Sequence, residues 1–344
     1  MDALFACLTQ EVKTIYTLEK ADFDIPILPE AQCIVIPVVR EVVAPILIRN
    51  NDADMVTDMR AAGKLRVRMI ASKTKGVERR RGSQILRSIG LGGWTAANKA
   101  YIKRGASAGD IFDLNTFVFG DSANGDANAI YPVHAAVLYS DALSIQGLEE
   151  PIVDDVFRQG GISEDSVSFD AQAQKTSSNI FTTRAVLPNT VFVQSMVMLG
   201  RRMTREALNH LLLAMGLAGS YGGATATTGT NIKTHLCGIY WGAFERSINA
   251  PQEMLLAINN VEIQQPMDVA KVIAGLEQVF SDPEMGYRHH ITAEQLRVYV
   301  SQLIEAFETD DNMLLDGYRN ASEQMRELFD AWFTPTSKLA KGRA

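Results

Sequence analysis

The chain has 344 residues, of which 47% are hydrophobic and 21% are charged, and its net charge is −7. These values are typical of globular proteins and exclude a fibrous repeat or a wholly disordered chain. The charge is unevenly distributed, because the segment from Arg60 to Arg104 contains thirteen lysines and arginines and a single acid, Glu78. Such a basic segment in an acidic chain indicates a localised polyanion site, with a surface loop paired to acids elsewhere as the alternative.

No feature of the sequence predicts a metal, a cofactor or a membrane span. Cys7, Cys33 and Cys237 are far apart and form no CxxC pair, which disfavours a zinc ribbon or a disulfide framework. The N-terminus lacks the basic region of a signal peptide, and the longest uncharged run, 207–232, contains five glycines. We therefore expect a cytoplasmic protein with reduced cysteines.

The first half of the chain predicts several strands. Residues 33–48 are rich in valine and isoleucine and indicate a long strand, bent or at an edge because of Pro37 and Pro45. Residues 64–69 alternate basic and apolar side chains, which predicts a strand with three cations on one face. Residues 73–81 continue the positive charge in a less regular segment, and 117–119 and 133–145 indicate further strands.

The second half alternates between strand and helix signals. Residues 149–170 are acidic, 171–183 are polar as in a flexible hairpin or loop, and 191–199 predict a buried strand. Thr204 is a candidate N-cap for a helix that ends near Gly216, and 235–241 predict the next strand.

The C-terminal third predicts three helices and a tail. Asp268 is placed to cap the first helix, Thr292 and Gln295 form a capping box for the second, and 313–333 form the third. The basic tail from residue 334 is predicted to be disordered.

Two local motifs suggest binding or catalysis. Residues 105–109 match the GxSxG pattern of serine hydrolases, with Ser107 as the nucleophile, although a flexible loop explains this pattern more simply. Residues 220–229 form a glycine-rich loop whose backbone amides can approach an anion, or which serves as a tight connection. Trp94 and Tyr101 accompany the basic segment, and cations near aromatic rings suit single-stranded nucleic acid.

Several segments in this order resemble the repeat-associated RNA-binding (RAMP) proteins of CRISPR systems. The segments are 82–87 (GSQILR), 117–122 (FVFGDS), 137–142 (VLYSDA), 184–192 (RAVLPNTVF) and the loop 221–229. Together with the long basic insertion and the helical C-terminus, they resemble the backbone subunit of type I-D surveillance complexes. The resemblance spans about residues 33–241.

This resemblance implies an α+β fold with a ferredoxin-like (RRM-like) core and large insertions. We expect an N-terminal segment (1–32), a palm core (33–250) and a helical C-terminal part (251–333), followed by the disordered tail (334–344). A basic finger insertion (about 52–115) and a thumb insertion (about 149–183) would interrupt the core.

The expected function is that of a non-catalytic subunit that stacks head to tail along the guide CRISPR RNA and supports pairing with target nucleic acid. Its expected partners are the guide RNA, target DNA or RNA, further copies of itself, and other Cascade subunits, namely the large subunit and the foot subunit that caps the guide 5′ end. An aspartate-dependent target-RNA endonuclease is the alternative, with Asp52, Asp54 or Asp58 as the candidate aspartate.

The candidate residues come from the basic segment and from the family resemblance. The resemblance assigns Ser83, Gln84 and Arg87 to a phosphate-contacting segment, and Tyr221, Gly222 and Gly223 to the glycine-rich loop. It places the thumb at 172–181, with Gln174, Lys175, Thr176 and Phe181 as thumb residues. The basic candidates for RNA binding are Lys64, Arg66, Arg68, Lys73, Lys75, Arg79, Arg80, Arg81 and Lys233.

Overall fold

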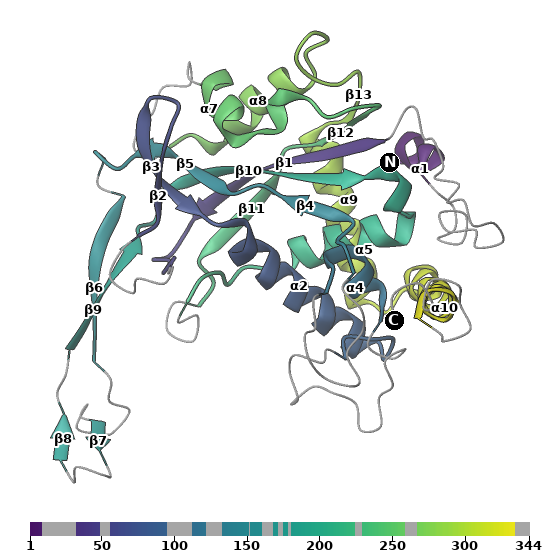
Figure 1. Ribbon diagram of the computed structural model, residues 1–344, viewed down its shortest axis with the longest axis horizontal. Helices are drawn as coiled ribbons and strands as arrows, with labels where there is room; N and C mark the ends of the chain where they lie inside the picture. The colour runs from purple at the N-terminus through teal and green to yellow at the C-terminus, as the bar shows by residue number, and fades with distance from the viewer. Residues whose placement is uncertain are drawn as a thin grey trace.

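An antiparallel sheet crosses the centre of the computed structural model, with helices on both of its faces (Figure 1). The structure describes residues 1–8, 32–48, 56–94, 112–121, 133–150, 152–159, 168–170, 175–177, 180–223, 229–258 and 267–333. The predicted N-terminal segment therefore lies mostly outside the described residues, and the predicted tail lies wholly outside them.

The sheet has the strand order β13-β12-β1-β10-β5-β3-β2, with β11 also paired to β1 and β4 also paired to β10. Its strands are β1 (Cys33–Val42), β2 (Asp58–Ala61), β3 (Lys64–Met69), β4 (Val137–Tyr139), β5 (Ala142–Gly147), β10 (Val191–Leu199), β11 (Ile232–Leu236), β12 (Ile239–Gly242) and β13 (His289–Ile291). The strand predicted at 191–199 is confirmed with the same bounds.

Strand β1 is a central strand, and it tolerates a proline because its partner is interrupted. β12 pairs with Cys33–Val35 and β11 pairs with Val38–Val42. Pro37 lies between these two pairings, where no amide hydrogen is needed, and its carbonyl accepts from the Cys237 amide at 2.9 Å. The prediction of one strand over 235–241 is thus wrong in detail, since two strands separated at Cys237–Gly238 occupy this region.

Helices cover both faces of the sheet. Below the sheet in Figure 1 lie α2, α4, α5, α9 and α10, and above it lie α7 and α8. The helices are α1 (Asp2–Cys7), α2 (Ala71–Ser88), α4 (Leu114–Phe119), α5 (Arg205–Gly216), α7 (Pro251–Ala257), α8 (Val269–Phe280), α9 (Ala293–Glu308) and α10 (Asn312–Phe333), with short 3₁₀ turns η3 (Gly200–Arg202) and η4 (Ser247–Asn249). Among the described helices, none is long and apolar enough to cross a membrane.

Alternation along β1 supplies apolar side chains to the cores on both faces of the sheet. Ile34, Ile36 and Val38 pack against the helices below the sheet, whereas Val35 and Val39 pack against α7 and α8. The predicted N-caps are confirmed, because the side chains of Thr204, Asp268 and Thr292 each accept a backbone amide at the start of their helices.

Two segments differ from their predicted secondary structure. Residues 73–81, predicted as irregular, lie inside the 18-residue helix α2, whose inward face is formed by residues such as Thr74, Glu78, Ile85 and Leu86. Residues 117–119, predicted as a strand, end the short helix α4, which Asp113 caps by accepting the Thr116 amide. All six residues of α4 are buried, so burial rather than helical amphipathicity determines its apolar sequence.

A long hairpin ribbon extends away from the sheet (Figure 1). It is built from β6 (Val153–Gln159) and β9 (Ile180–Val186), and β7 (Ser168–Asp170) and β8 (Lys175–Ser177) pair at its far end. The ribbon is attached through reciprocal backbone hydrogen bonds of 2.9 Å between Ile46 and Val186. This ribbon coincides with most of the region predicted as a thumb insertion.

We expect Gly82→Ala to lower the free energy of unfolding by about 1–3 kcal/mol, the usual cost of overpacking. Helix propensity alone would favour alanine in α2. However, a Cβ at Gly82 would lie 2.1 Å from Asn115 Oδ1 and 2.8 Å from His210 Nε2. Chemical denaturation measures the change.

Gly76→Ala is the matched control in the same helix. A Cβ at Gly76 meets only the flexible end of Arg80, at 3.9 Å, so we expect stabilisation by up to about 1 kcal/mol. Equal effects of the two substitutions would contradict this packing analysis.

Candidate nucleic-acid interface

The glycine-rich loop and the basic helix α2 form the two walls of one cleft. The cleft has a volume of about 340 Å³. Its lining residues are Leu47, Ser72, Lys73, Gly76, Val77, Arg80, Gly222 and Gly223. The basic helix and the glycine-rich loop, about 145 residues apart in the sequence, thus meet at one site. There, Lys73 and Arg80 lie across the cleft from the main chain of Gly222 and Gly223.

Backbone geometry explains why glycines occupy the loop wall. Gly222 has φ +79°, and a Cβ there would lie 2.5 Å from the Leu47 carbonyl oxygen. The Gly223 amide donates to this same carbonyl at 2.9 Å. The loop therefore lies directly against the chain segment that follows β1.

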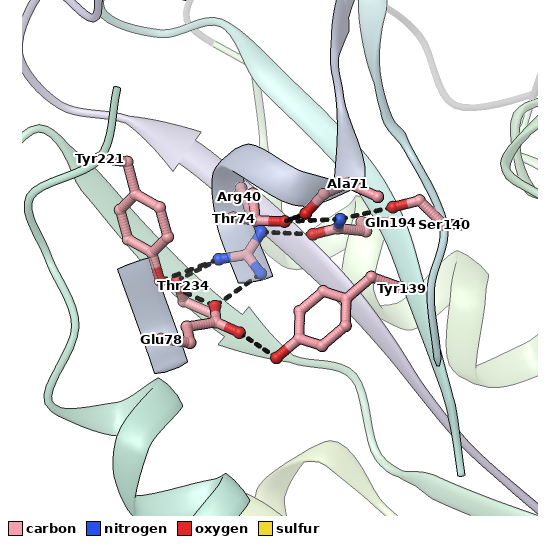
Figure 2. Close-up of polar contacts among 9 residues, drawn as sticks. All are labelled: Arg40, Ala71, Thr74, Glu78, Tyr139, Ser140, Gln194, Tyr221 and Thr234. Atoms are coloured by element: carbon pink, nitrogen blue, oxygen red, sulfur yellow. Dashed lines mark hydrogen bonds and ion pairs between the residues drawn. The ribbon is translucent and has the colours of Figure 1, made fainter. Parts of the chain in front are cut away.

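A buried polar network fixes the position of α2 and the loop (Figure 2). At its centre, the Arg40 guanidinium of β1 contacts Glu78 of α2 at 2.8 Å, and both side chains are fully buried. Arg40 also donates to the Tyr221 hydroxyl at 3.1 Å and to Gln194 at 2.7 Å. The Tyr221 hydroxyl donates to Glu78 at 2.9 Å, so the residue just before the two cleft glycines is held by the same ion pair.

Further hydrogen bonds satisfy the rest of this network. The Tyr139 hydroxyl donates to the second carboxylate oxygen of Glu78, and the Gln194 amide donates to Thr74 and to the Ser140 carbonyl. Burial lowers the pKa of Arg40, but Glu78 together with the hydroxyls of Tyr221 and Tyr139 outweighs burial, so the pKa is raised overall. Burial and the nearby Glu78 raise the pKa of the Tyr221 and Tyr139 hydroxyls, so these groups stay protonated as donors.

The predicted basic residues divide into cleft residues and paired residues. Lys73 and Arg80 line the cleft, and both are exposed. Arg79 pairs with Asp121 at 2.8 Å, Arg68 with Asp141 at 2.5 Å and Lys64 with Glu149 at 3.3 Å. These acids neutralise part of the basic segment.

The remaining predicted cations have other surroundings. Lys75 lies over the Tyr139 ring at 6.0 Å, and burial together with Arg79 lowers its pKa. Arg81 is half-buried on α2. Arg87 donates to the Gly93 carbonyl at 2.9 Å, and Lys233 is exposed on β11 opposite Glu41.

Three predicted contact residues are buried and hold the fold together. The strand predicted at 64–69 is confirmed as β3, but Arg66 is 4% exposed and donates to the carbonyls of Ala61, Ser144 and Ile145, so this cation is not accessible to a ligand. The Ser83 hydroxyl accepts from Asn115 at 2.9 Å, whereas Gln84 next to it is exposed. Tyr221 is fully buried in the network described above.

The structure describes only some of the remaining predicted site residues. Lys175 and Thr176 lie in β8 and Phe181 lies in β9, whereas Gln174, Asp52, Asp54 and Ser107 lie outside the described residues. Asp58 begins β2 and is exposed. Within the described part of the chain, no three histidine, cysteine or acidic side chains are grouped so as to hold a metal ion.

The sequence interpretation missed Arg40 and Glu78. Two signals were present, because Glu78 is the only acid in the basic segment and Arg40 follows seven residues of an apolar strand. A charge in a buried strand requires an opposite charge, which points to such a pair.

Comparisons with known proteins show the family of the chain. The fold resembles the crystal structure of Thermofilum pendens Csc2, with a TM-score of 0.55, 14% identity, and coverage of 94% of this chain and 98% of that one. A structure described as a CRISPR RNA-guided surveillance complex matches 78% of this chain and 99% of its own, with 12% identity and a TM-score of 0.46. A search of curated proteins finds no match.

The family described as Csc2 Crispr matches residues 18–310. This match covers most of the sequence and includes both walls of the cleft. The chain belongs to the Csc2 family of CRISPR proteins.

We expect Glu78→Gln to lower the free energy of unfolding by about 3–5 kcal/mol, because it leaves the Arg40 charge buried without its counter-charge. Glu41→Gln is the control on β1. Glu41 forms a half-exposed pair with His235 at 2.9 Å, and loss of such a pair costs at most about 1 kcal/mol. Urea denaturation of both variants checks the difference, and similar losses would contradict a dominant role for the buried pair.

Proposed function

We propose that this chain is a non-catalytic, guide-RNA-binding backbone subunit of a type I-D CRISPR surveillance complex. In this role, copies stack head to tail along the guide RNA and support its pairing with target nucleic acid. Membership of a CRISPR family supports the biological setting.

The observation that carries the proposal is the cleft between α2 and the glycine-rich loop. Its loop wall has no side chain at Gly222 and Gly223, so a sugar–phosphate backbone can approach the protein main chain closely. Its helix wall provides Lys73 and Arg80, which neutralise phosphates. Such contacts are independent of base sequence, as the binding of variable guides requires.

The topology supports assignment of a ferredoxin-like core. The order β1–α2–β5–β10–α5–β11/β12 along the chain is β-α-β-β-α-β, and the spatial order β12/β11-β1-β10-β5 is that of a ferredoxin-like sheet. Both helices of this unit, α2 and α5, pack together on one sheet face. In this assignment, α7, α8 and the β6–β9 ribbon are additions to the core.

The ribbon is the proposed thumb. Its attachment at Ile46 is adjacent to Leu47, a cleft residue, so a strand of RNA leaving the cleft can continue along the ribbon. The further proposed partners are target DNA or RNA, neighbouring copies of the chain, and the large and foot subunits of the complex.

Nucleic acid that co-purifies with the native protein tests the proposed role directly. We expect an RNA of uniform length with a repeat-derived end, identified on a denaturing gel and by sequencing. A smear of cellular RNA, or none, would contradict a guide-binding role.

We expect the double variant Lys73→Ala/Arg80→Ala to bind single-stranded RNA more weakly and with a reduced salt dependence. Removal of two phosphate contacts should reduce the slope of log K against log salt by about 1.4, since each contact contributes about 0.7 for single strands. Fluorescence anisotropy at several salt concentrations measures this slope.

Arg326→Ala is the control for lost charge, because Arg326 is exposed on α10, outside the residues that line the cleft. We expect the slope of this variant to be unchanged. An unchanged slope for Lys73→Ala/Arg80→Ala would place RNA elsewhere on the protein.

A further inference from the structure

A second, larger groove lies between α5, α9 and the start of α10. It has a volume of about 600 Å³. Leu303, Leu314 and the ring of Tyr299 contribute its apolar lining, and Met313 at its edge is 81% exposed. Gly317 faces Glu206, where a Cβ would lie 3.8 Å from the Glu206 side chain, so the absence of a side chain at Gly317 widens the groove.

The surroundings of this groove are acidic. Residues 298–318 contain Glu305, Glu308, Asp310, Asp311 and Asp316 and no lysine or arginine, and Glu206 of α5 adds a further acid. Asp316 pairs with Arg319 at 2.5 Å, whereas no described residue forms an ion pair with Glu206. The one cation in the lining, Arg205, stacks over the Phe5 ring at 4.7 Å. An occupant that combines an apolar side chain with positive charge therefore fits the groove.

The chain itself contains such a segment. Residues 334–344 include Lys338, Lys341 and Arg343, no acid, and a single large apolar residue, Leu339. Because Leu339 lies between two lysines, it can enter the apolar groove while the lysines reach the acidic edges.

Leu339 of the same copy does not reach the apolar lining at Leu314. Leu314 and Phe333 are separated by 19 residues of α10, or about 28 Å at the helical rise. Leu339 is six residues beyond Phe333 and reaches at most about 22 Å even when fully extended. The path back along α10 also has to cross the width of the helix, so the segment of another copy is the one that can place Leu339 against Leu314.

We propose that the groove between α5, α9 and α10 binds the basic segment 334–344 of a second copy of the chain, with Leu339 in the apolar lining and the lysines beside Glu206 and Asp311. This interface is separate from the cleft and does not depend on RNA. Because each copy carries one groove and one basic segment, such contacts can continue from one copy to the next instead of ending at a dimer.

A labelled peptide of residues 334–344 tests the groove on the full chain, after bound nucleic acid has been removed. Fluorescence anisotropy should show binding that weakens with salt, and Glu206→Lys should weaken it by at least about tenfold through like-charge repulsion. Glu323→Lys makes the same charge change at an exposed position of α10 outside the groove lining and should leave binding unchanged. A peptide with Lys338→Glu and Lys341→Glu should bind the Glu206→Lys chain more tightly than it binds the parent chain.

Sedimentation velocity of the nucleic-acid-free full chain tests the contact between copies. The parent chain should self-associate at low salt, and Lys338→Glu/Lys341→Glu should shift it towards monomer. Three results would overturn the proposal: no peptide binding, equal binding to the Glu206→Lys and Glu323→Lys chains, or self-association that the tail substitutions do not change.

Discussion

The ion pair between Arg40 and Glu78 is the constraint on which the arrangement of the cleft depends. Both side chains are fully buried, and the pair connects the central strand of the sheet to the middle of the basic helix. Transfer of two charges from water into a protein interior is costly unless every donor and acceptor is satisfied. Tyr221, Tyr139, Gln194 and Thr234 complete the arrangement, so α2 and the glycine-rich loop have little freedom to shift relative to β1.

This pair also explains how a highly basic helix packs against an apolar core. The inward face of α2 places Glu78 against Arg40 of the sheet. The only acid of the basic segment therefore pairs with a buried cation outside that segment and neutralises none of the segment's own charges. The cations on the other faces of α2 are therefore directed to the surface, where Asp121 pairs with Arg79. Of the basic side chains, Lys73 and Arg80 line the cleft. The positive charge that a ligand meets in the cleft is therefore smaller than the net charge of the whole basic segment.

Much of the architecture was predictable, because regular patterns and caps depend on local chemistry. The strand at 191–199, the caps at Thr204, Asp268 and Thr292, and the three C-terminal helices follow from periodicity and hydrogen bonding within a few residues. Residues 73–81 and 117–119 were misassigned because long-range burial determines their structure. The same reason applies to Arg66, since alternation along a strand does not reveal that backbone carbonyls from β5 surround its guanidinium.

The attachment of the ribbon to the cleft has a mechanical consequence. Ile46 bonds to Val186 at the root of the ribbon, and the adjacent Leu47 bonds to Gly223 in the cleft wall. The base of the ribbon and the wall of the cleft therefore share one short stretch of backbone, residues 46–47. A substitution that breaks the backbone pairing at 46–47 would consequently disturb the seating of both the ribbon and the glycine-rich loop.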